Sequence, residues 1–415
     1  MTATTTAAER SHATAATTHF PILILGGGTA GICVAAQLRN RGTQGVAIVE
    51  PSQEHYYQPL WTLVGGGVLS ASETIRKEAD FIPSGVTWIQ NYATSIDPNE
   101  NAVTLGDGTR LTYDYLVVAC GLQLDWNRVT GLCETLGHNG VSSNYDIELA
   151  PKTWEYIKNF KGGRALFTFP AGPIKCAGAP QKIMYLAADY FKKHGVRAEI
   201  FYATAGPAIF GVKHYQAPLN KVVARYGIHT MFNHNLVAID GAKHEATFEI
   251  VNDPDKARVT VPFDFIHVTP PQSAPDFIKT NDLLAQPDGP TKGYLRVDQH
   301  TMQNPDFPNI FALGDAGSTT NSKTGAAVRR QAPVVVENLL AQMHHRPLEA
   351  SYNGYASCPL ITGYGKLILA EFDYDGNPTP SIPLIDTTKE RWSMYMLKLH
   401  ALPWMYWNLM MKGKA

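Results

Sequence analysis

Five cysteines supply the side chains of this sequence best suited to redox or nucleophilic chemistry: Cys33, Cys120, Cys133, Cys176 and Cys358. An odd and sparse set is no disulfide scaffold, and without a CxxC pair no metal site is expected. Cys176 lies in a loop rich in proline and glycine, and Cys358 directly precedes Pro359. Such positions suit a reactive thiol, although the usual fate of a cysteine is burial in a core.

A glycine-rich turn near the start of the chain predicts a dinucleotide site. Gly26 permits a tight turn, Gly28 lets the backbone approach a pyrophosphate, and Gly31 lets a helix pack on a strand. An apolar strand over 22–25, a helix over 32–40 and a second strand over 46–50 surround the turn, and Glu50 can hydrogen-bond ribose hydroxyls. Glycine-rich turns occur by chance, but this complete βαβ context favours binding.

A distant segment indicates FAD rather than NAD as the ligand. The apolar run 310–313 ends in Gly314 and Asp315, and it resembles the second FAD signature of the two-dinucleotide-domain flavoproteins. The resemblance implies that Asp315 holds the ribityl chain. Gly121, which follows the buried strand over 115–119, is counted with the same site. The alternative is a strand followed by an ordinary capped helix.

The NAD(P)H motif that most of these flavoproteins carry mid-chain is missing. A strand over 164–169 stands in the right place, but residues 170–180 have the wrong glycine spacing. Pro170, Pro173 and Pro180 occur in this loop, and proline has no backbone N–H to bind phosphate. The sequence therefore predicts a second nucleotide-binding fold that has lost its ligand and holds Cys176 in the loop instead.

Several segments resemble the sulfide:quinone oxidoreductases, specifically the mitochondrial type and its bacterial relatives. The resemblance runs from residue 20 to residue 413 and includes the loop 172–182 around Cys176. Other matching segments are 55–61, 314–315 with 322–324, 357–359 and 371–374. Because the matches are spread over the chain, the resemblance is specific.

The resemblance implies the chemistry of the site. A redox disulfide between Cys176 and Cys358 would lie beside the isoalloxazine, where sulfide attacks it, Cys358 carries the persulfide and Cys176 faces the flavin. Lys323 is carried over as a positive charge near flavin or quinone, and a solvated lysine at a helix start is the alternative. The residues expected to line a quinone channel are Tyr364, Lys366 and Phe372.

The same resemblance implies the partners: hydrogen sulfide, ubiquinone or menaquinone, and a small sulfur acceptor such as sulfite, a thiol or cyanide. A homodimer is left open. No nucleic acid is expected, because a formal net charge of -1 gives no basic field. Three alternatives remain: a type-2 NADH:quinone oxidoreductase, a flavocytochrome c sulfide dehydrogenase, and a non-catalytic FAD-binding membrane protein. The broken middle motif disfavours the first, and the lack of a signal peptide the second.

Residues 391–412 predict an interfacial membrane anchor. Pro403 is expected to divide the stretch into two helices, each too short to span a bilayer. The aromatic and basic residues that suit the headgroup layer are Trp392, Tyr395, Trp404, Tyr406 and Trp407, flanked by Arg391, Lys398 and Lys412. The alternative is a helix pair packed on the protein's own core or on a dimer mate. The expected location is peripheral, on the cytoplasmic membrane if the protein is bacterial, with no signal peptide.

The elements that position these residues predict an α/β fold with tandem Rossmann-like FAD/NAD(P)-binding domains, the second degenerate, plus a C-terminal membrane-docking region. With 415 residues, 44% hydrophobic, the chain can build several cores. The expected parts are a disordered tail over 1–18, an FAD domain from 19–125 and 290–345, the second domain over 126–289, and a quinone and membrane region over 346–415.

Overall fold

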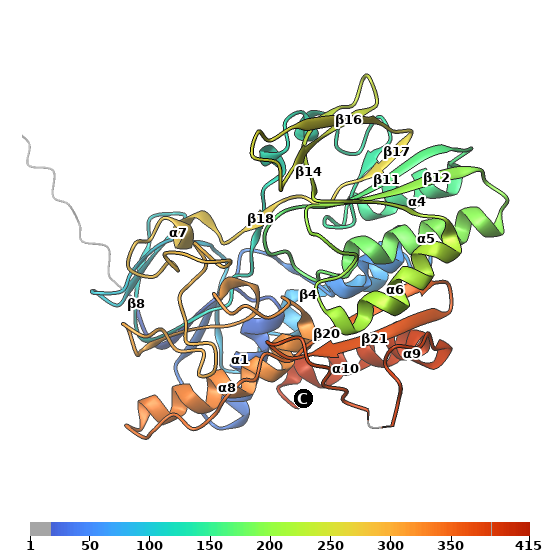
Figure 1. Ribbon diagram of the computed structural model, residues 1–415. Coiled ribbons are helices and arrows are strands. Elements are labelled where there is room, and N and C mark those ends of the chain that lie inside the picture. Colours follow the sequence, from blue (N-terminus) through green and yellow to red (C-terminus); the bar gives the residue numbers. More distant parts are fainter. Residues whose placement is uncertain (1–17, 383) are drawn as a thin grey trace, which may run out of the picture.

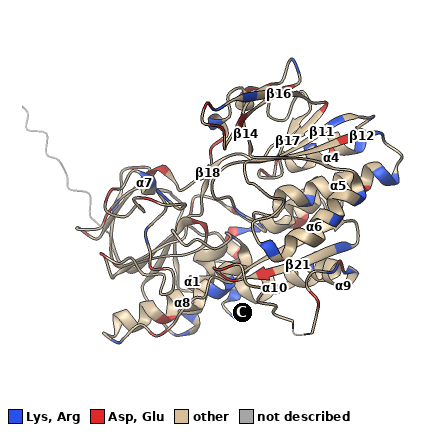
Figure 2. Cartoon of the chain, viewed as in Figure 1, with Lys and Arg blue, Asp and Glu red and all other residues tan. Residues whose placement is uncertain are grey.

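The computed structural model describes residues 18–382 and 384–415 (Figure 1). The tail predicted over 1–18 lies outside the described residues except for Thr18, which begins strand β1. Basic and acidic residues are scattered along both halves of the chain (Figure 2).

The first sheet has seven strands and joins two distant segments of the chain. Its order is β5-β2-β1-β8-β7-β6, and β19 pairs with β8. The bounds are β1 (Thr18–Leu25), β2 (Val46–Val49), β5 (Thr87–Ile89), β6 (Ala93–Asp97), β7 (Ala102–Leu105), β8 (Arg110–Val118) and β19 (Ile310–Ala312). β1 runs parallel to β2 and β8, and β19 runs parallel to β8. The predicted strand over 86–97 is two strands, β5 and β6.

Helices α1 (Thr29–Asn40) and α8 (Gly325–Met343) pack against each other on one face of this sheet (Figure 1). Ile22 and Ile24 of β1 face them, whereas Leu23 and Leu25 face the opposite core, which includes α7 (Asp276–Lys279). All four side chains are buried, as expected for a continuous apolar run in a central parallel strand.

The second sheet has five parallel strands in the order β10-β17-β11-β12-β13. The bounds are β10 (Val141–Ser142), β11 (Gly163–Phe169), β12 (Ala198–Thr204), β13 (His229–Phe232) and β17 (Phe265–His267). One face packs on helices α4 (Ala150–Asn159), α5 (Ala179–Lys193) and α6 (Lys213–Tyr226). The other packs on an antiparallel sheet of β14 (His234–Asp240), β15 (Glu245–Ile250) and β16 (Arg258–Pro262). The predicted fold class, two Rossmann-like units of which the second is degenerate, is confirmed; the domain bounds stay a prediction.

The last region begins with a hairpin of β20 (Ala356–Gly363) and β21 (Lys366–Phe372), which packs on α5 (Figure 1). Helix α9 (Trp392–Met396), a π-helical turn (Leu397–Ala401) and helix α10 (Leu402–Asn408) then follow without a break. The prediction that Pro403 divides two helices is wrong. Pro403 is the second residue of α10, directly after the wider π turn, and the helical path continues through it.

The remaining short elements connect these layers. They are β3 (Glu54–Tyr56), α2 (Trp61–Gly65), β4 (Ile75–Lys77), β9 (Gln123–Leu124), α3 (Leu132–Thr135), β18 (Gln272–Ser273) and several 3₁₀ turns. Strands β9 and β18 pair with each other where the chain passes between the two large sheets (Figure 1). Of the helices that the structure describes, none combines the length and the apolar composition needed to cross a bilayer.

Candidate active site

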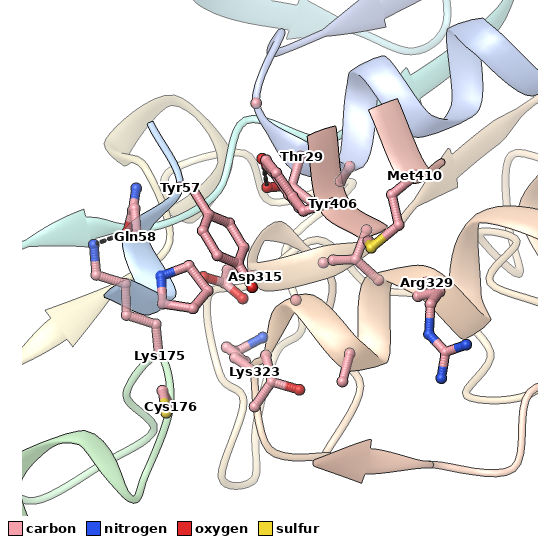
Figure 3. Close-up of a pocket in the computed structure, with 18 of the residues that line it drawn as sticks. Thr29, Tyr57, Gln58, Lys175, Cys176, Asp315, Lys323, Arg329, Tyr406 and Met410 are labelled. Atoms are coloured by element: carbon pink, nitrogen blue, oxygen red, sulfur yellow. Dashed lines mark hydrogen bonds between the residues drawn. The ribbon is translucent and has the colours of Figure 1, made fainter. Parts of the chain in front are cut away.

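A cavity of about 770 Å³ lies where the first sheet, the Cys176 loop and the C-terminal region meet (Figure 3). Its wall includes predicted residues from both segments of the first unit: Gly26, Gly28, Glu50, Gly121, Asp315 and Lys323. It also includes groups from the other regions: Lys175, Cys176, Lys182, Tyr355, Glu371, Lys398 and Tyr406. The fold thus gathers side chains that are far apart in the sequence.

The glycine turn has the form that a bound dinucleotide requires. Gly26 has a φ of +99°, and a Cβ there would lie 2.6 Å from the carbonyl oxygen of Ala119. A Cβ on Gly31 would lie 1.9 Å from the carbonyl oxygen of Gly26, so no side chain fits between helix and strand. Gly28 has open space beside it and lines the cavity, which leaves the N-terminus of α1 free to approach phosphates.

Acidic and unpartnered polar groups complete this part of the cavity. Glu50, one residue after β2, accepts hydrogen bonds from the backbone N–H groups of Gly27 (2.7 Å) and Ser52 (2.8 Å), and burial raises its pKa. Burial also raises the pKa of Asp315, against the charges of Lys323 and Lys175. Further buried atoms in the wall have no partner among the described residues: Trp61 Nε1, Glu78 Oε1 and the side-chain amide of Asn144. A cradle without side chains, flanked by half-buried acids and free polar atoms, fits FAD.

Cys176 and Cys358 meet at the cavity wall from two distant segments. Cys176 has a φ of 53°, an uncommon left-handed conformation for a residue with a side chain, and its N–H donates to the carbonyl of Lys323 (2.7 Å). The two thiols hydrogen-bond each other. Cys176 lines the cavity, whereas Cys358 is 0% exposed and lies behind it in the core between β20 and α5.

Lysines control the charge of this pair. Lys182 Nζ lies 3.1 Å from Cys176 Sγ, although Lys182 is only 2% exposed. The hydrogen bond from Cys358 and the charges of Lys182 and Lys398 hold the pKa of Cys176 well below its ordinary value. The same contact and burial raise the pKa of Cys358. Cys176 is therefore the thiolate of the pair and Cys358 the neutral partner.

Two other lysines around the cavity, Lys323 and Lys398, are buried as well, and Lys175 is half-buried. Burial lowers the pKa of Lys323 to about 8, and its ammonium donates to the carbonyl of Gly317 (2.8 Å) above the ring of Tyr294. The alternative of a solvated Lys323 does not hold, since the residue is 3% exposed. Burial lowers the pKa of Lys175 to about 8 and that of Lys398 to about 7.

The hairpin β20–β21 has two faces with different surroundings. Ser357 pairs with Glu371 and Pro359 with Leu369, and these four residues line the cavity. Cys358 and its pair Ala370 point to the opposite face. This alternation follows from the period of two in a strand. It places Cys358 one residue away from the cavity side of the hairpin.

The three residues expected to line a quinone channel lie outside the cavity wall. Phe372 is on the same face of the hairpin as Cys358 and packs against Phe210. Tyr364 donates a hydrogen bond from its hydroxyl to the carbonyl of Gly66 (2.7 Å), and Lys366 is exposed. None of the three is among the described residues that line the cavity.

The C-terminal helices are partly internal. Lys398 is 3% exposed and donates to the carbonyl of Pro59 (3.0 Å), so its predicted position in a headgroup layer is wrong. Tyr406 is also buried; its hydroxyl lies 2.7 Å from Thr29 Oγ1 and 2.6 Å from His55 Nε2. Trp392 and Trp404 are 65% and 59% exposed. Packing on the protein's own core thus accounts for one side of the stretch, and the two tryptophans project from the other.

Sequence reasoning missed four functional candidates: Lys182, Tyr355, Glu371 and Lys398. A usable signal existed for two of them, because Lys398 interrupts an apolar aromatic stretch and Glu371 interrupts the apolar strand 367–372. Of the remaining cysteines, Cys33 is buried in the core, whereas Cys120 lines the cavity. Burial raises the pKa of Cys33 and of Cys120 to about 12, and Cys133 is exposed.

Comparison with known proteins identifies the family. The family model of pyridine nucleotide-disulphide oxidoreductases matches residues 20–153. Proteins named mitochondrial sulfide:quinone oxidoreductase from Mus musculus and Dictyostelium discoideum are 43% and 44% identical to this chain, each over 95% of it and over 87% and 86% of their own lengths. The sulfide:quinone oxidoreductase structure from Aquifex aeolicus has a TM-score of 0.78 at 21% identity, covering 96% of this chain and 92% of that one. The chain belongs to the family of sulfide:quinone oxidoreductases.

Proposed function

We propose that this chain oxidises sulfide at Cys176 and Cys358 and delivers the electrons to a quinone. It is an FAD-dependent oxidoreductase, and its substrates are sulfide and a quinone. One observation carries the assignment of residues: Cys176 faces the cavity, contacts Cys358 behind it and has an ammonium group 3.1 Å from its sulfur. Two cysteines that serve only in packing would need neither an adjacent cavity nor a buried ammonium group.

The sulfur chemistry begins with the two cysteines joined as a disulfide. Hydrosulfide attacks Cys358 Sγ, the S–S bond breaks, and Cys358 becomes a persulfide while Cys176 leaves as a thiolate. Lys182 stabilises that leaving thiolate by a charge-assisted hydrogen bond. A nucleophile then takes the outer sulfur and leaves Cys358 as a thiolate, and the disulfide re-forms as two electrons leave the pair.

The glycine turn, Glu50 and Asp315 would hold the cofactor, with Lys323 and Lys175 as nearby positive charges. FAD, when bound, accepts the two electrons from the cysteines and passes them to the quinone. Lys323 would stabilise negative charge in the cavity as electrons arrive, because its burial leaves little solvent to screen it, and the half-buried Lys175 adds a second positive charge. Cys176 lies between this part of the cavity and Cys358.

The outer sulfur goes to a small anion or thiol such as sulfite, a thiol or cyanide, and the quinone is ubiquinone or menaquinone. We place the quinone against the cavity face of β20–β21. Tyr364, Lys366 and Phe372, which the sequence predicts for this role, are not part of that face. Trp392 and Trp404 supply apolar surface for peripheral contact with a membrane. The relatives carry mitochondrial names, which gives no support to a bacterial cytoplasmic membrane. A homodimer is compatible with this arrangement.

Anaerobic reduction by sulfide tests the cysteine assignment. Sulfide should bleach the oxidised flavin of the wild type, and a short-chain ubiquinone analogue should restore it. Cys176→Ser and Cys358→Ser should each lose this bleaching, while Cys133→Ser, an exposed cysteine, should keep it. Bleaching by sulfide in Cys358→Ser at the wild-type rate would contradict the proposal, and bleaching of the wild type by NADH but not by sulfide would favour the NADH dehydrogenase.

A further inference from the structure

A buried carboxyl group lies on the quinone side of the hairpin. Glu371 is 2% exposed, interrupts the apolar part of strand β21 over 367–372 and lines the cavity. Burial of a carboxyl group in an apolar strand is costly unless partners stabilise it, and such a group in a cavity is a candidate for proton transfer.

Three donors converge on this carboxyl group. The hydroxyl of Tyr355 donates to Oε1 at 2.5 Å, the hydroxyl of Ser381 donates to the same oxygen at 2.6 Å, and the N–H of Ser381 donates to Oε2 at 3.0 Å. Tyr355 comes from the segment before β20 and Ser381 from the segment after β21. The chain entering the hairpin and the chain leaving it therefore both fix the position of the carboxyl. Such donors stabilise the carboxylate that remains when the acid gives up a proton.

The surroundings of Glu371 suit a flat ring with an apolar tail. Pro359 and Leu369, the next pair along the same hairpin face, line the cavity together with Ile382. Glu371 is thus an acidic group between this apolar part of the wall and the polar side chains of Ser357 and Ser381. Lys182 and Lys398 instead act on the cysteine pair, where their charges lower the pKa of Cys176.

We propose that Glu371 is the acid that protonates a quinone oxygen during quinone reduction, with Tyr355 and Ser381 holding its carboxyl at the cavity wall. The inference rests on the proposed function. The quinone gains two electrons from the bound cofactor and one proton at each oxygen. At one oxygen an O–H bond forms as the O–H bond of Glu371 breaks, and Glu371 regains its proton from water; the other oxygen takes its proton from solvent.

Separate measurement of the two half-reactions tests Glu371 independently of the proposed function. In stopped-flow experiments, Glu371→Gln should be reduced by sulfide at the wild-type rate. Its reoxidation by decylubiquinone should be about 100-fold slower, since general acids contribute 10²- to 10⁴-fold. Reoxidation by ferricyanide, which needs no proton, should be unchanged. Glu349→Gln makes the same chemical change at an exposed site and should behave as the wild type.

A second variant guards against a folding defect in Glu371→Gln. Tyr355→Phe keeps the ring beneath Arg330 but removes one donor to the carboxyl, and should slow only the quinone phase, by about threefold to tenfold for one lost hydrogen bond. Equal reoxidation of wild type and Glu371→Gln by decylubiquinone would overturn the assignment of Glu371. So would an equal loss with both oxidants, because it would indicate a disturbed cofactor site. Failure of sulfide to reduce the wild type would instead contradict the proposed function.

Discussion

Lys182 Nζ lies 3.1 Å from Cys176 Sγ, and both residues belong to the segment that replaces the nucleotide-binding turn of the second unit. Cys176 lies near the end of the loop between β11 and α5, and Lys182 lies in the first turns of α5. A helix N-terminus that binds phosphate in a typical dinucleotide domain here presents a buried ammonium group to a thiolate. The degenerate unit therefore holds a cysteine thiolate at the place where a typical dinucleotide domain binds a phosphate.

Removal of the Lys182 charge should slow sulfide oxidation. Lys182→Met keeps much of the side-chain volume but leaves the Cys176 thiolate without its nearest cation. A hydrogen bond to a charged group contributes about 2 kcal/mol, so flavin reduction by sulfide should be roughly 30-fold slower. Lys193→Met, at an exposed site on the same helix, serves as the control. Rapid-mixing absorbance at saturating sulfide measures the rate, and an unchanged rate in Lys182→Met would contradict this role.

Loss of the Tyr406 hydroxyl should weaken FAD binding. The hydroxyl joins Thr29, the first residue of α1, to His55, and His55 Nδ1 lies 2.7 Å from Glu78 Oε2. Tyr406→Phe leaves the buried His55 and the half-buried Thr29 each without this partner, which costs about 1–3 kcal/mol, and we expect the dissociation constant of FAD to rise about tenfold. Fluorescence titration of the deflavinated protein measures it. Tyr374→Phe, a tyrosine outside the cavity lining, should bind FAD as the wild type does.

Stability should depend on pH through Lys398. Burial lowers its pKa from 10.5 to about 7 in the folded state, so the unfolded chain binds this proton more tightly. The cost of burying the charged Lys398 therefore destabilises the folded state fully below pH 7. This destabilisation is relieved as the pH rises from about 7 toward 10.5. Lys398→Met removes it. Thermal unfolding of the FAD-loaded proteins should show the variant more stable at pH 6, with a smaller difference at pH 9; a difference that grows with pH would contradict this assignment.

The two exposed tryptophans should control membrane affinity. Trp392→Ser combined with Trp404→Ser removes two large apolar side chains, each worth about 2 kcal/mol on burial, so partitioning to vesicles should fall at least tenfold. Co-sedimentation with phosphatidylcholine vesicles containing anionic lipid provides the measurement. Tyr92→Ser, an aromatic residue 57% exposed on the first unit, is the matched control. Equal partitioning of all three proteins would place the membrane contact elsewhere.

The sequence by itself determined the first dinucleotide unit, the loss of the second nucleotide motif and the two cysteine loops. These features are local: Gly26 and Gly31 are required by contacts within one βαβ unit, and prolines remove backbone donors wherever they stand. The joining of β19 to β8 was also predictable, because a Gly-Asp signature after an apolar run has a family precedent.

Only the tertiary structure decided which side chains share the cavity. The parity of the hairpin register places Glu371 on the cavity side and Phe372 on the Cys358 side, and a shift of one residue would exchange them. The continuous helical path through the π turn buries Lys398 beneath Pro59, although its sequence context resembles a membrane surface. Such outcomes depend on packing between segments hundreds of residues apart, which composition and periodicity within a single segment do not encode.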